Sequence, residues 1–380
     1  MTEETKSLRA AVPHGPETQR AAVLHGPKDL RVEERPVPAP GPGEVLVRIA
    51  AVGLCGSDLH YYAHGENGPN VLRAPTVLGH EPSGVVVAAG PGAGHPEPGT
   101  PVAVEPAHPC GRCALCRAGR YNLCPRGTCF GSPPTDGALT EYLVVPEGFV
   151  HPLPASMDVR HGALIEPLAV AVHAVRRSGI APGDRVLVTG AGPIGLLVLQ
   201  VALASGAASV TVSDVAGARL RHAAELGAET VGAAELTPDP ARATALADPG
   251  GFDVALDCSG NGGALVGAIR ALRPGGTAVV VGNPSAPVTE LPLAWMQRQE
   301  MSLVTAFRYA GDFPAAIALA GTGRIRLEPL VTASFPLDRA DAALTAALTD
   351  RSQLKVLVEP GLATASGGLS GTWQEGRARG

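Results

Sequence analysis

Residues 185–214 constrain the fold of this chain more than any other stretch. An apolar run from Arg185 to Thr189 leads into GAGPIG, where Gly190, Gly192 and Gly195 have the spacing G-x-G-x-x-G. Glycines at this spacing allow a tight turn, a close approach of pyrophosphate to the backbone, and close packing of a helix on a strand. The stretch therefore predicts a buried parallel strand, a phosphate-binding turn, and a helix that offers its first N–H groups to the phosphates.

The next strand of this unit, SVTVSD, ends in Asp214, 19 residues after Gly195. A carboxylate at that place accepts hydrogen bonds from the ribose hydroxyls of adenosine and repels a 2′-phosphate. Arg219 follows closely enough in the sequence to soften that discrimination. The sequence therefore predicts NAD as the cofactor, preferred over NADP.

Strands and helices continue to alternate up to MSLVTAF at residues 301–307. With a short strand near Thr230 they make six strands, the number found in a doubly wound parallel sheet. Residues 21–165 differ, because short apolar runs such as EVLVRIAAVGL and SGVVVAAG are separated by Pro and Gly, which is typical of a compact barrel-like β domain. We therefore predict an α/β protein with a doubly wound six-stranded domain and a second, β-rich domain.

A chain of 380 residues is long enough for two domains with separate cores. We expect the β-rich catalytic domain at residues 21–165, the dinucleotide-binding domain at 166–308, and a return of the chain to the first domain at 309–360. Residues 1–20 and 361–380 have no apolar periodicity, and we expect both to be disordered tails.

Four of the seven cysteines are bunched within fifteen residues and have the spacing C-x2-C-x2-C-x7-C. They are Cys110, Cys113, Cys116 and Cys124. Four thiolates in one short loop can close a tetrahedral zinc site that leaves no position open for chemistry. We predict a structural zinc lobe at residues 105–130, the alternative being a redox pair or free thiols. Cys129 and Cys258 lie outside the set, and we expect them to be ordinary buried thiols.

A second group of possible metal ligands lies between Val52 and Glu81. Cys55, His80 and Glu81 offer sulfur, nitrogen and oxygen donors, and three protein ligands with an open position are what a catalytic zinc needs. Each residue taken alone is better explained as a buried thiol or a surface polar group, and only the three together indicate a metal site. Glu166 opens a strongly apolar helical segment, so we take it as a further candidate carboxylate for this site.

Charge and hydropathy limit the partners that the chain is expected to have. The formal net charge is −5, which argues against nucleic acid as a main partner. We expect no membrane span, since no apolar run reaches the ~18 residues that one requires. The N-terminus has no apolar signal region, and clustered cysteines resemble metal ligands more than a disulfide framework, so we expect a cytoplasmic setting.

Several motifs together resemble the zinc-containing medium-chain dehydrogenases, over residues 21–360. They are CGSDLHYYAHG, VLGHEPSG, the four-cysteine lobe, GALIEPLAVAVHA, VLVTGAGPIG and FRYAGDFPAAIAL. Within that superfamily the chain resembles the polyol branch, the sorbitol, xylitol and L-idonate 5-dehydrogenases. It has Glu166 where simple alcohol dehydrogenases have a second zinc-binding Cys. The resemblance implies a GroES-like catalytic domain, two zinc ions per chain, NAD, and a homotetramer or homodimer in which MSLVTAF is a plausible edge strand for pairing.

The resemblance also implies a role for individual residues. The catalytic zinc ligands are Cys55, His80, Glu81 and Glu166, with Asp58 orienting a ligand. Ser57, Glu166 and His60 form the proton path, although His60 is equally compatible with a solvated side chain. The substrate contacts are Tyr61, Glu166, Arg308 and Tyr309; Tyr61 can instead be a packing residue, and Arg308 can instead pair with a structural carboxylate. The NAD contacts are Gly190, Gly192, Pro193, Ile194, Gly195, Asp214, Arg219, Val281, Gly282 and Asn283.

These residues lead to a functional hypothesis: zinc-dependent, NAD-linked oxidation of a secondary hydroxyl of a small polyol or sugar acid to a ketone. Two alternatives remain open at this stage. One is an amino-alcohol dehydrogenase of the L-threonine 3-dehydrogenase type, and the other is a non-catalytic NAD(H)-binding relative. A module built only on the four-cysteine lobe would leave GAGPIG and Asp214 unexplained.

Overall fold

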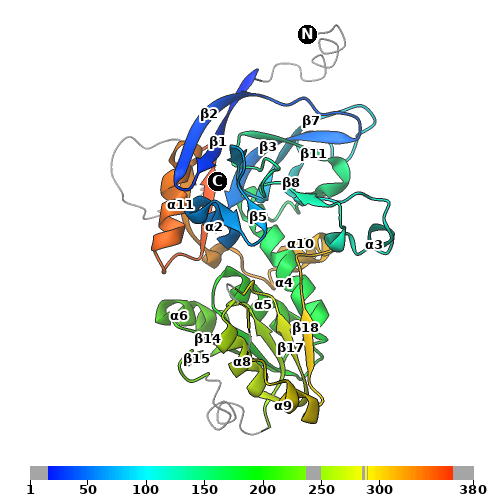
Figure 1. Ribbon diagram of the computed structural model, residues 1–380. Coiled ribbons are helices and arrows are strands. Elements are labelled where there is room, and N and C mark those ends of the chain that lie inside the picture. The colour runs from blue at the N-terminus through cyan, green and yellow to red at the C-terminus, as the bar shows by residue number, and fades with distance from the viewer. Residues whose placement is uncertain (1–15, 237–249, 285–286, 289, 363–380) are drawn as a thin grey trace, which may run out of the picture.

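The computed structural model describes residues 16–236, 250–284, 287–288 and 290–362. It has a β-rich half and a half built on one parallel sheet, and the long helix α4 (Ile165–Ser178) lies where they meet (Figure 1). The predicted α/β fold class is confirmed by this arrangement. Most of the two predicted tails, residues 1–15 and 363–380, lies outside the described residues.

The β-rich half contains a three-stranded sheet of order β2-β1-β6 and a seven-stranded sheet of order β12-β8-β7-β3-β20-β19, in which β11 also pairs with β3. The strands are β1 Thr18–Gly26, β2 Asp29–Pro36, β3 Glu44–Gly53, β6 Thr76–Val77, β7 Glu81–Ala89, β8 Pro101–Val104, β11 Tyr142–Pro146, β12 Val150–Pro152, β19 Val331–Pro336 and β20 Lys355–Glu359. Shorter pairs are β4 Glu66–Asn67 with β5 Asn70–Val71, and β9 Ala107–His108 with β10 Thr128–Cys129.

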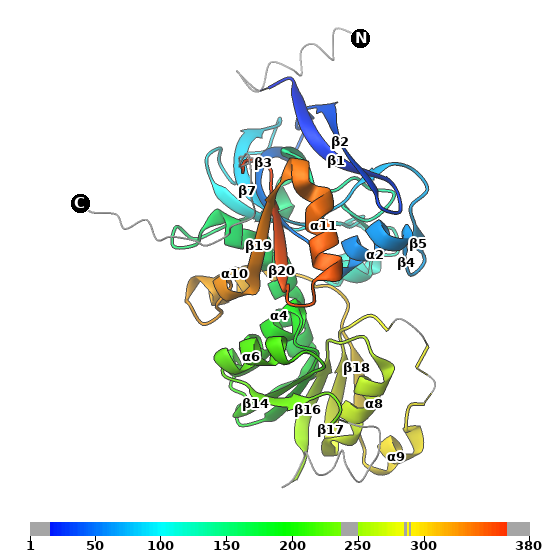
Figure 2. The ribbon, with the colours of Figure 1, turned by 90° about the vertical axis from the view of Figure 1, so that its left-hand side faces the viewer.

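The described helices in this half are short, and the longest, α11 (Ala340–Thr349), has 10 residues. They are α2 Gly56–His64, α3 Ala114–Arg117, α11 Ala340–Thr349, and the 3-10 turns η2 Tyr121–Leu123, η3 Glu147–Phe149, η4 Val159–Leu164, η5 Glu328–Leu330 and η6 Leu337–Arg339. Figure 2 shows α11 beside β19 and β20, with α2 next to it. The Tyr62 hydroxyl donates to Asp341 Oδ1 at 2.7 Å, which ties α2 to α11.

Strand β1 begins at Thr18, so the predicted tail boundary at residue 20 was wrong by a few residues. Thr18 pairs with Pro36 in the β1–β2 ladder. The Arg20 guanidinium binds the Glu141 carboxylate, and the Gln19 side chain accepts a hydrogen bond from the Tyr142 backbone N–H. Glu141 and Tyr142 are more than a hundred residues away in the sequence, so local spacing did not predict that the strand begins before residue 20.

The second half contains a six-stranded parallel sheet of order β15-β14-β13-β16-β17-β18 within the described ranges. The strands are β13 Arg185–Thr189, β14 Ser209–Asp214, β15 Glu229–Gly232, β16 Phe252–Asp257, β17 Leu272–Val280 and β18 Ser302–Thr305. The helices are α5 Pro193–Ala204, α6 Gly217–Glu225, α8 Gly262–Arg270, α9 Leu293–Arg298 and α10 Phe313–Gly321. The short strand expected near Thr230 is β15, and the last predicted strand is β18 at one edge of the sheet.

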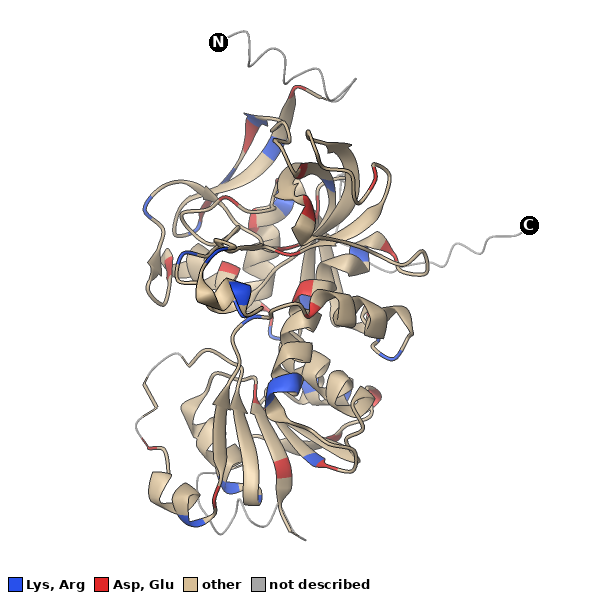
Figure 3. Ribbon diagram, turned by 90° about the vertical axis from the view of Figure 1, so that its right-hand side faces the viewer, with Lys and Arg blue, Asp and Glu red and all other residues tan. Residues whose placement is uncertain are grey.

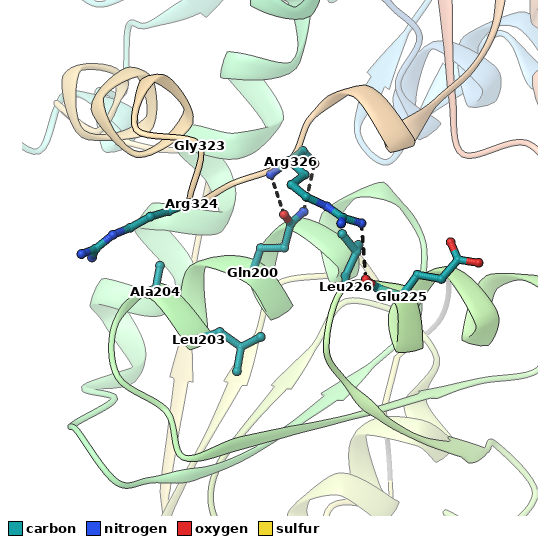
Figure 4. Close-up of a pocket in the computed structure, with 8 residues that line it drawn as sticks. All are labelled: Gln200, Leu203, Ala204, Glu225, Leu226, Gly323, Arg324 and Arg326. Atoms are coloured by element: carbon teal, nitrogen blue, oxygen red, sulfur yellow. Dashed lines mark hydrogen bonds between the residues drawn. The ribbon is translucent and has the colours of Figure 1, made fainter.

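The chain returns to the β-rich half along residues 323–326, which pack against α5 (Figure 4). There the Gln200 side chain accepts from the Arg326 backbone N–H at 2.7 Å and donates to the Arg326 carbonyl at 3.3 Å. The Arg326 guanidinium donates to the Glu225 carbonyl at 3.3 Å. A buried amide therefore fixes the returning segment before it forms β19 and β20.

Figure 3 shows that Lys and Arg positions and Asp and Glu positions are interspersed along the ribbon of both halves. Within the described residues, no helix combines the length and the apolar character that are needed to cross a membrane.

Candidate metal centre and dinucleotide site

The pairing of β3 with β7 brings the first set of donors together. Gly53 at the end of β3 pairs with Glu81 at the start of β7, so Cys55 and His80, which flank this pair, become neighbours. One donor atom each from Cys55, His80 and Glu81 lies within 4.8 Å of the others. A thiolate, an imidazole and a carboxylate at this separation fit a zinc ion that keeps a fourth position for substrate.

Asp58 is completely buried and links the two segments that carry these donors. Its carboxylate accepts from the Cys55 N–H at 2.9 Å and from the Gly79 N–H at 3.2 Å. Its Oδ1 lies 3.5 Å from His80 Nδ1, which is an ion-pair distance at the outer limit of a hydrogen bond. With Nδ1 turned toward Asp58, the other ring nitrogen of His80 is left for a metal.

Lys355 is a site residue that sequence reasoning missed. Its Nζ lies 2.6 Å and 2.9 Å from the two Glu81 carboxylate oxygens and donates to the Leu54 carbonyl at 3.0 Å. The Lys355 and Glu81 side chains are 3% and 1% exposed, so each charge depends on the other. A carboxylate has about four lone-pair sites, so Glu81 can accept from Lys355 and still offer an oxygen to a metal.

Space for this buried pair depends on a glycine. A Cβ placed on Gly53 would lie 2.2 Å from Glu81 Oε2 and 3.2 Å from the Lys355 side chain. Only a residue without a side chain leaves room for the Glu81 carboxylate at the end of β3.

Glu166 lies in the first turn of α4 and is 7% exposed. Burial raises the pKa of its carboxyl to about 7; the charge of His80 opposes this rise and that of Glu81 adds to it. Glu166 is not among the residues whose donor atoms come within 4.8 Å of one another in the described part of the chain. Of the two carboxylates, Glu81 therefore lies with the other donors, and Glu166 is a nearby group that can change protonation near neutral pH.

The proposed substrate and proton-path residues lie on two segments. Ser57 and His60 are on α2, where Ser57 is partly exposed and His60 is exposed. Tyr61 is buried in the core of the β-rich half. Tyr309 is 1% exposed, and its hydroxyl lies close enough to the Glu166 carboxylate to interact with it. Burial and the Glu166 charge raise the pKa of this hydroxyl.

Arg308 follows β18 at the carboxyl end of the sheet, where ligands gather in such folds. Its backbone is in the left-handed region, with φ of 50°, and its guanidinium lies over the Phe307 ring. Burial raises the pKa of the Cys129 thiol; the charges of Arg308 and His80 lower this pKa, and the charge of Glu166 raises it. Cys129 is thus buried as expected, but it lies near the donor set rather than in an unrelated part of the core.

The four-cysteine lobe projects from the β-rich half around α3 (Figure 1). The four cysteine sulfur atoms lie within 4.8 Å of one another, and Cys113 Sγ lies 3.4 Å from Cys116 Sγ. The Arg112 backbone N–H is the largest influence that lowers the pKa of Cys110, which falls to about 5, and the Arg126 guanidinium helps. A loop that stabilises a thiolate in this way fits a closed zinc site.

The dinucleotide motif forms the turn that its glycines predict. Gly190 has φ of 91°, Gly192 caps α5, and Pro193 is its first residue, followed by the partly buried Ile194. A Cβ on Gly195 would lie 1.8 Å from the Gly190 carbonyl oxygen, so the helix can approach the strand only with glycine there. The turn lines a pocket of about 480 Å³ together with Asp214 and Arg219.

Asp214 is 9% exposed and accepts from the Ala191 and Ala216 backbone N–H groups, each at 2.7 Å. Arg219 donates to the Arg351 and Gln353 carbonyls, which fixes its side chain near Gly192. Residues 281–283 follow β17, and the N–H groups of Val281 and Gly282 both donate to the Asp257 carbonyl. The Asn283 carbonyl oxygen lies 2.6 Å from the position of a Cβ on Gly260, so this turn packs closely on the loop after β16.

Comparisons with known proteins agree with this geometry. Residues 41–155 match the model of the alcohol dehydrogenase GroES-like domain, and residues 193–322 match that of the zinc-binding dehydrogenase. A sorbitol dehydrogenase of Gallus gallus is 43% identical over 314 residues, which are 82% of this chain and 88% of the relative.

Two solved structures extend the comparison. L-Idonate 5-dehydrogenase from Escherichia coli str. K-12 substr. MG1655 superposes with a TM-score of 0.84 at 33% identity, covering 90% of this chain and 98% of the other. A putative zinc-binding dehydrogenase from Sinorhizobium meliloti 1021, bound to NADP, has a TM-score of 0.82 at 33% identity, covering 91% of this chain and 100% of the other.

The expected family, the use of zinc and a nicotinamide cofactor, and the GroES-like domain are thereby confirmed. The chain belongs to the zinc-containing medium-chain dehydrogenases of the polyol type, oxidoreductases that act on CH–OH groups.

Proposed function

We propose that this enzyme oxidises a secondary hydroxyl of a polyol or sugar acid to a ketone, with NAD as the oxidant. The observation that carries the proposal is a sulfur, a nitrogen and an oxygen donor within 4.8 Å, with the buried Glu166 nearby in place of a second thiolate. The names of two relatives, sorbitol dehydrogenase and L-idonate 5-dehydrogenase, support a polyhydroxylated substrate.

Cys55, His80 and Glu81 would hold the catalytic zinc, and the four-cysteine lobe a second zinc ion. When bound, zinc supplies Lewis acidity that lowers the pKa of a hydroxyl at its open position, and NAD supplies the hydride acceptor. Gly190, Gly192 and Gly195 would receive the pyrophosphate, and Asp214 the adenosine ribose, which favours NAD over NADP.

The remaining roles belong to side chains of this chain. Glu166, with its raised pKa, holds or releases a proton near neutral pH, and Ser57 and His60 on α2 lead that proton toward solvent. The buried Tyr309 hydroxyl, beside Glu166, and the Arg308 guanidinium would orient the substrate hydroxyls. Tyr61 of α2, which is buried in the core of the β-rich half, would border the substrate site.

We also propose that the enzyme is a homodimer or homotetramer and that it is located in the cytoplasm. The exposed edge position of β18 supports pairing of two sheets in a homodimer or homotetramer. The free cysteines are compatible with the reducing, cytoplasmic setting that the cysteine pattern favours.

A substrate panel tests the proposal directly. Sorbitol, xylitol, L-idonate, L-threonine and ethanol are offered with NAD and with NADP, and reduced cofactor is followed at 340 nm. We expect turnover of at least one polyol or sugar acid with NAD. Preferential turnover of L-threonine would favour an amino-alcohol dehydrogenase, and NAD binding without turnover of any substrate would favour a non-catalytic relative.

The variant Arg308→Ala separates the two substrate kinds. A guanidinium can hold a carboxylate through two charge-assisted hydrogen bonds, each roughly twice as strong as a neutral one. We therefore expect the variant to lower kcat/KM for both kinds and to lower it more for L-idonate than for sorbitol or xylitol. Equal losses would mean that Arg308 orients hydroxyl groups only.

A further inference from the structure

The segment that carries Arg308 and Tyr309 is held by the four-cysteine lobe. The Asn122 side-chain N–H donates to the Phe307 carbonyl at 2.8 Å. The Gly311 backbone N–H donates to the Tyr121 hydroxyl at 2.7 Å. These two hydrogen bonds lie on either side of Arg308 and Tyr309, and both come from η2, the turn that leads directly into Cys124.

The held segment has a backbone that needs support. Arg308 is one of the few residues other than glycine with positive φ in the described chain. A bulky side chain in that region costs conformational free energy, so it persists only where neighbouring contacts define it. The hydrogen bonds at residues 307 and 311 are such contacts.

The Tyr121 hydroxyl is itself fixed by buried groups. It donates to Glu105 Oε1 at 2.6 Å, and Glu105 Oε2 lies 3.0 Å from His151 Nε2. The His151 ring stacks on Phe313 at 4.8 Å between centroids, and Phe313 packs edge-on against Tyr309 at 5.1 Å. A continuous set of contacts therefore runs from the lobe to the proposed substrate residue Tyr309.

We propose that Tyr121 and Asn122 are positioning residues. Through them the four-cysteine lobe holds the backbone of Arg308 and Tyr309, the proposed substrate contacts, which together we call the substrate wall. The lobe thus acts on substrate affinity as well as on folding. The inference rests on the proposed function for the role of that wall, but the contacts that define it do not.

Hydrogen–deuterium exchange of the full-length protein, read by mass spectrometry, tests the coupling without turnover. Asn122→Ala removes one bond, and Tyr121→Phe removes the acceptor for Gly311 while keeping the ring that packs on Phe149. We expect peptides covering residues 306–312 to exchange faster in both variants. Leu123→Ala is the matched control, since this side chain is exposed in the same turn and lacks a polar group.

Kinetics of the same variants test whether the coupling reaches the substrate. Loss of one hydrogen bond should raise KM for the polyol about three- to tenfold. KM for NAD and the zinc content should stay unchanged in both variants, because neither residue is a cysteine of the lobe or lies in the dinucleotide pocket. Cys124→Ser should increase exchange in residues 306–312 as well, since it disturbs η2 from the lobe side.

Two results would overturn the inference: unchanged exchange in both Tyr121→Phe and Asn122→Ala, or faster exchange with an unchanged KM for the polyol. If the wild-type protein does not turn over any polyol, the proposed function is contradicted. The exchange measurement would still decide whether the lobe holds residues 306–312 in place.

Discussion

The two groups of metal donors are built in opposite ways. The four cysteines of the lobe lie within fifteen residues of one another and are partly exposed, and local N–H groups lower the pKa of Cys110 and of Cys113. Cys55, His80 and Glu81 come from two segments joined by the β3–β7 ladder, with Asp58 and Lys355 buried behind them. A local loop can close a metal site and stabilise a fold, whereas an assembled site can keep one side open and supply buried charges around it.

The largest expected effect comes from removing one ligand of each group. Cys55→Ser should lower kcat/KM on the order of 10³-fold or more, because it removes several kcal/mol of transition-state stabilisation, while melting changes little. Cys113→Ser should lower Tm and assembly more than it lowers the activity per folded molecule. Metal analysis should find two zinc ions in the wild type and about one in each variant. Equal effects of the two variants on Tm would break the distinction between an open and a closed site.

Lys355→Met should be the most damaging change behind the assembled site. Removing one partner of a buried ion pair costs about 3–5 kcal/mol, so we expect Tm to fall by about 10 °C in a thermal melt. Arg31→Met is the control, since its ion pair with Asp29 lies on the surface and should contribute little. The double variant Lys355→Met/Glu81→Gln should recover part of the loss. If it melts no higher than Lys355→Met alone, the Glu81 charge is not what the lysine compensates.

Glu166→Gln should change the pH profile. Hydroxyl oxidation needs an unprotonated base, and burial raises the Glu166 pKa to about 7, so kcat/KM should rise as pH increases toward and through that value. The positive charges of bound zinc and NAD move this rising limb of the pH profile of kcat/KM to lower pH. The variant should lose about 10²-fold in kcat/KM and the limb itself, measured from pH 5 to 9. His64→Gln, at the exposed end of α2, should keep the limb. A limb that survives in Glu166→Gln would assign the proton to another group.

The smallest expected effect concerns Asp214, which belongs to a local motif. Asp214→Ala should raise KM for NAD about tenfold and lower the preference for NAD over NADP, because the variant no longer repels a 2′-phosphate. The ratio of kcat/KM values for the two cofactors measures this. Glu229→Ala on the adjacent strand is a charge-matched control that should leave the ratio unchanged. A wild type that prefers NADP would show that Arg219 outweighs Asp214.

Local patterns in the sequence were sufficient to predict the dinucleotide-binding turn and the four-cysteine lobe. The G-x-G-x-x-G turn, Asp214 at the end of the next strand, and the four clustered cysteines each lie within one short segment, so spacing alone defines their geometry. The alternation of strands and helices likewise predicted the six-stranded sheet. Cys55, His80 and Glu81 were found because their donor types match, although only the pairing of Gly53 with Glu81 makes them neighbours.

Only the tertiary structure decided how the assembled site is supported. Lys355 lies 274 residues after Glu81 and reaches it because β20 pairs with β3, a long-range contact with no sequence period of its own. The same holds for Tyr121 and Asn122, which meet the Arg308 segment across more than 180 residues. Two buried side chains can neutralise each other's charge or form a hydrogen bond only if the fold places them side by side. Sequence spacing predicts such a pair only when both residues lie in the same helix, strand or loop.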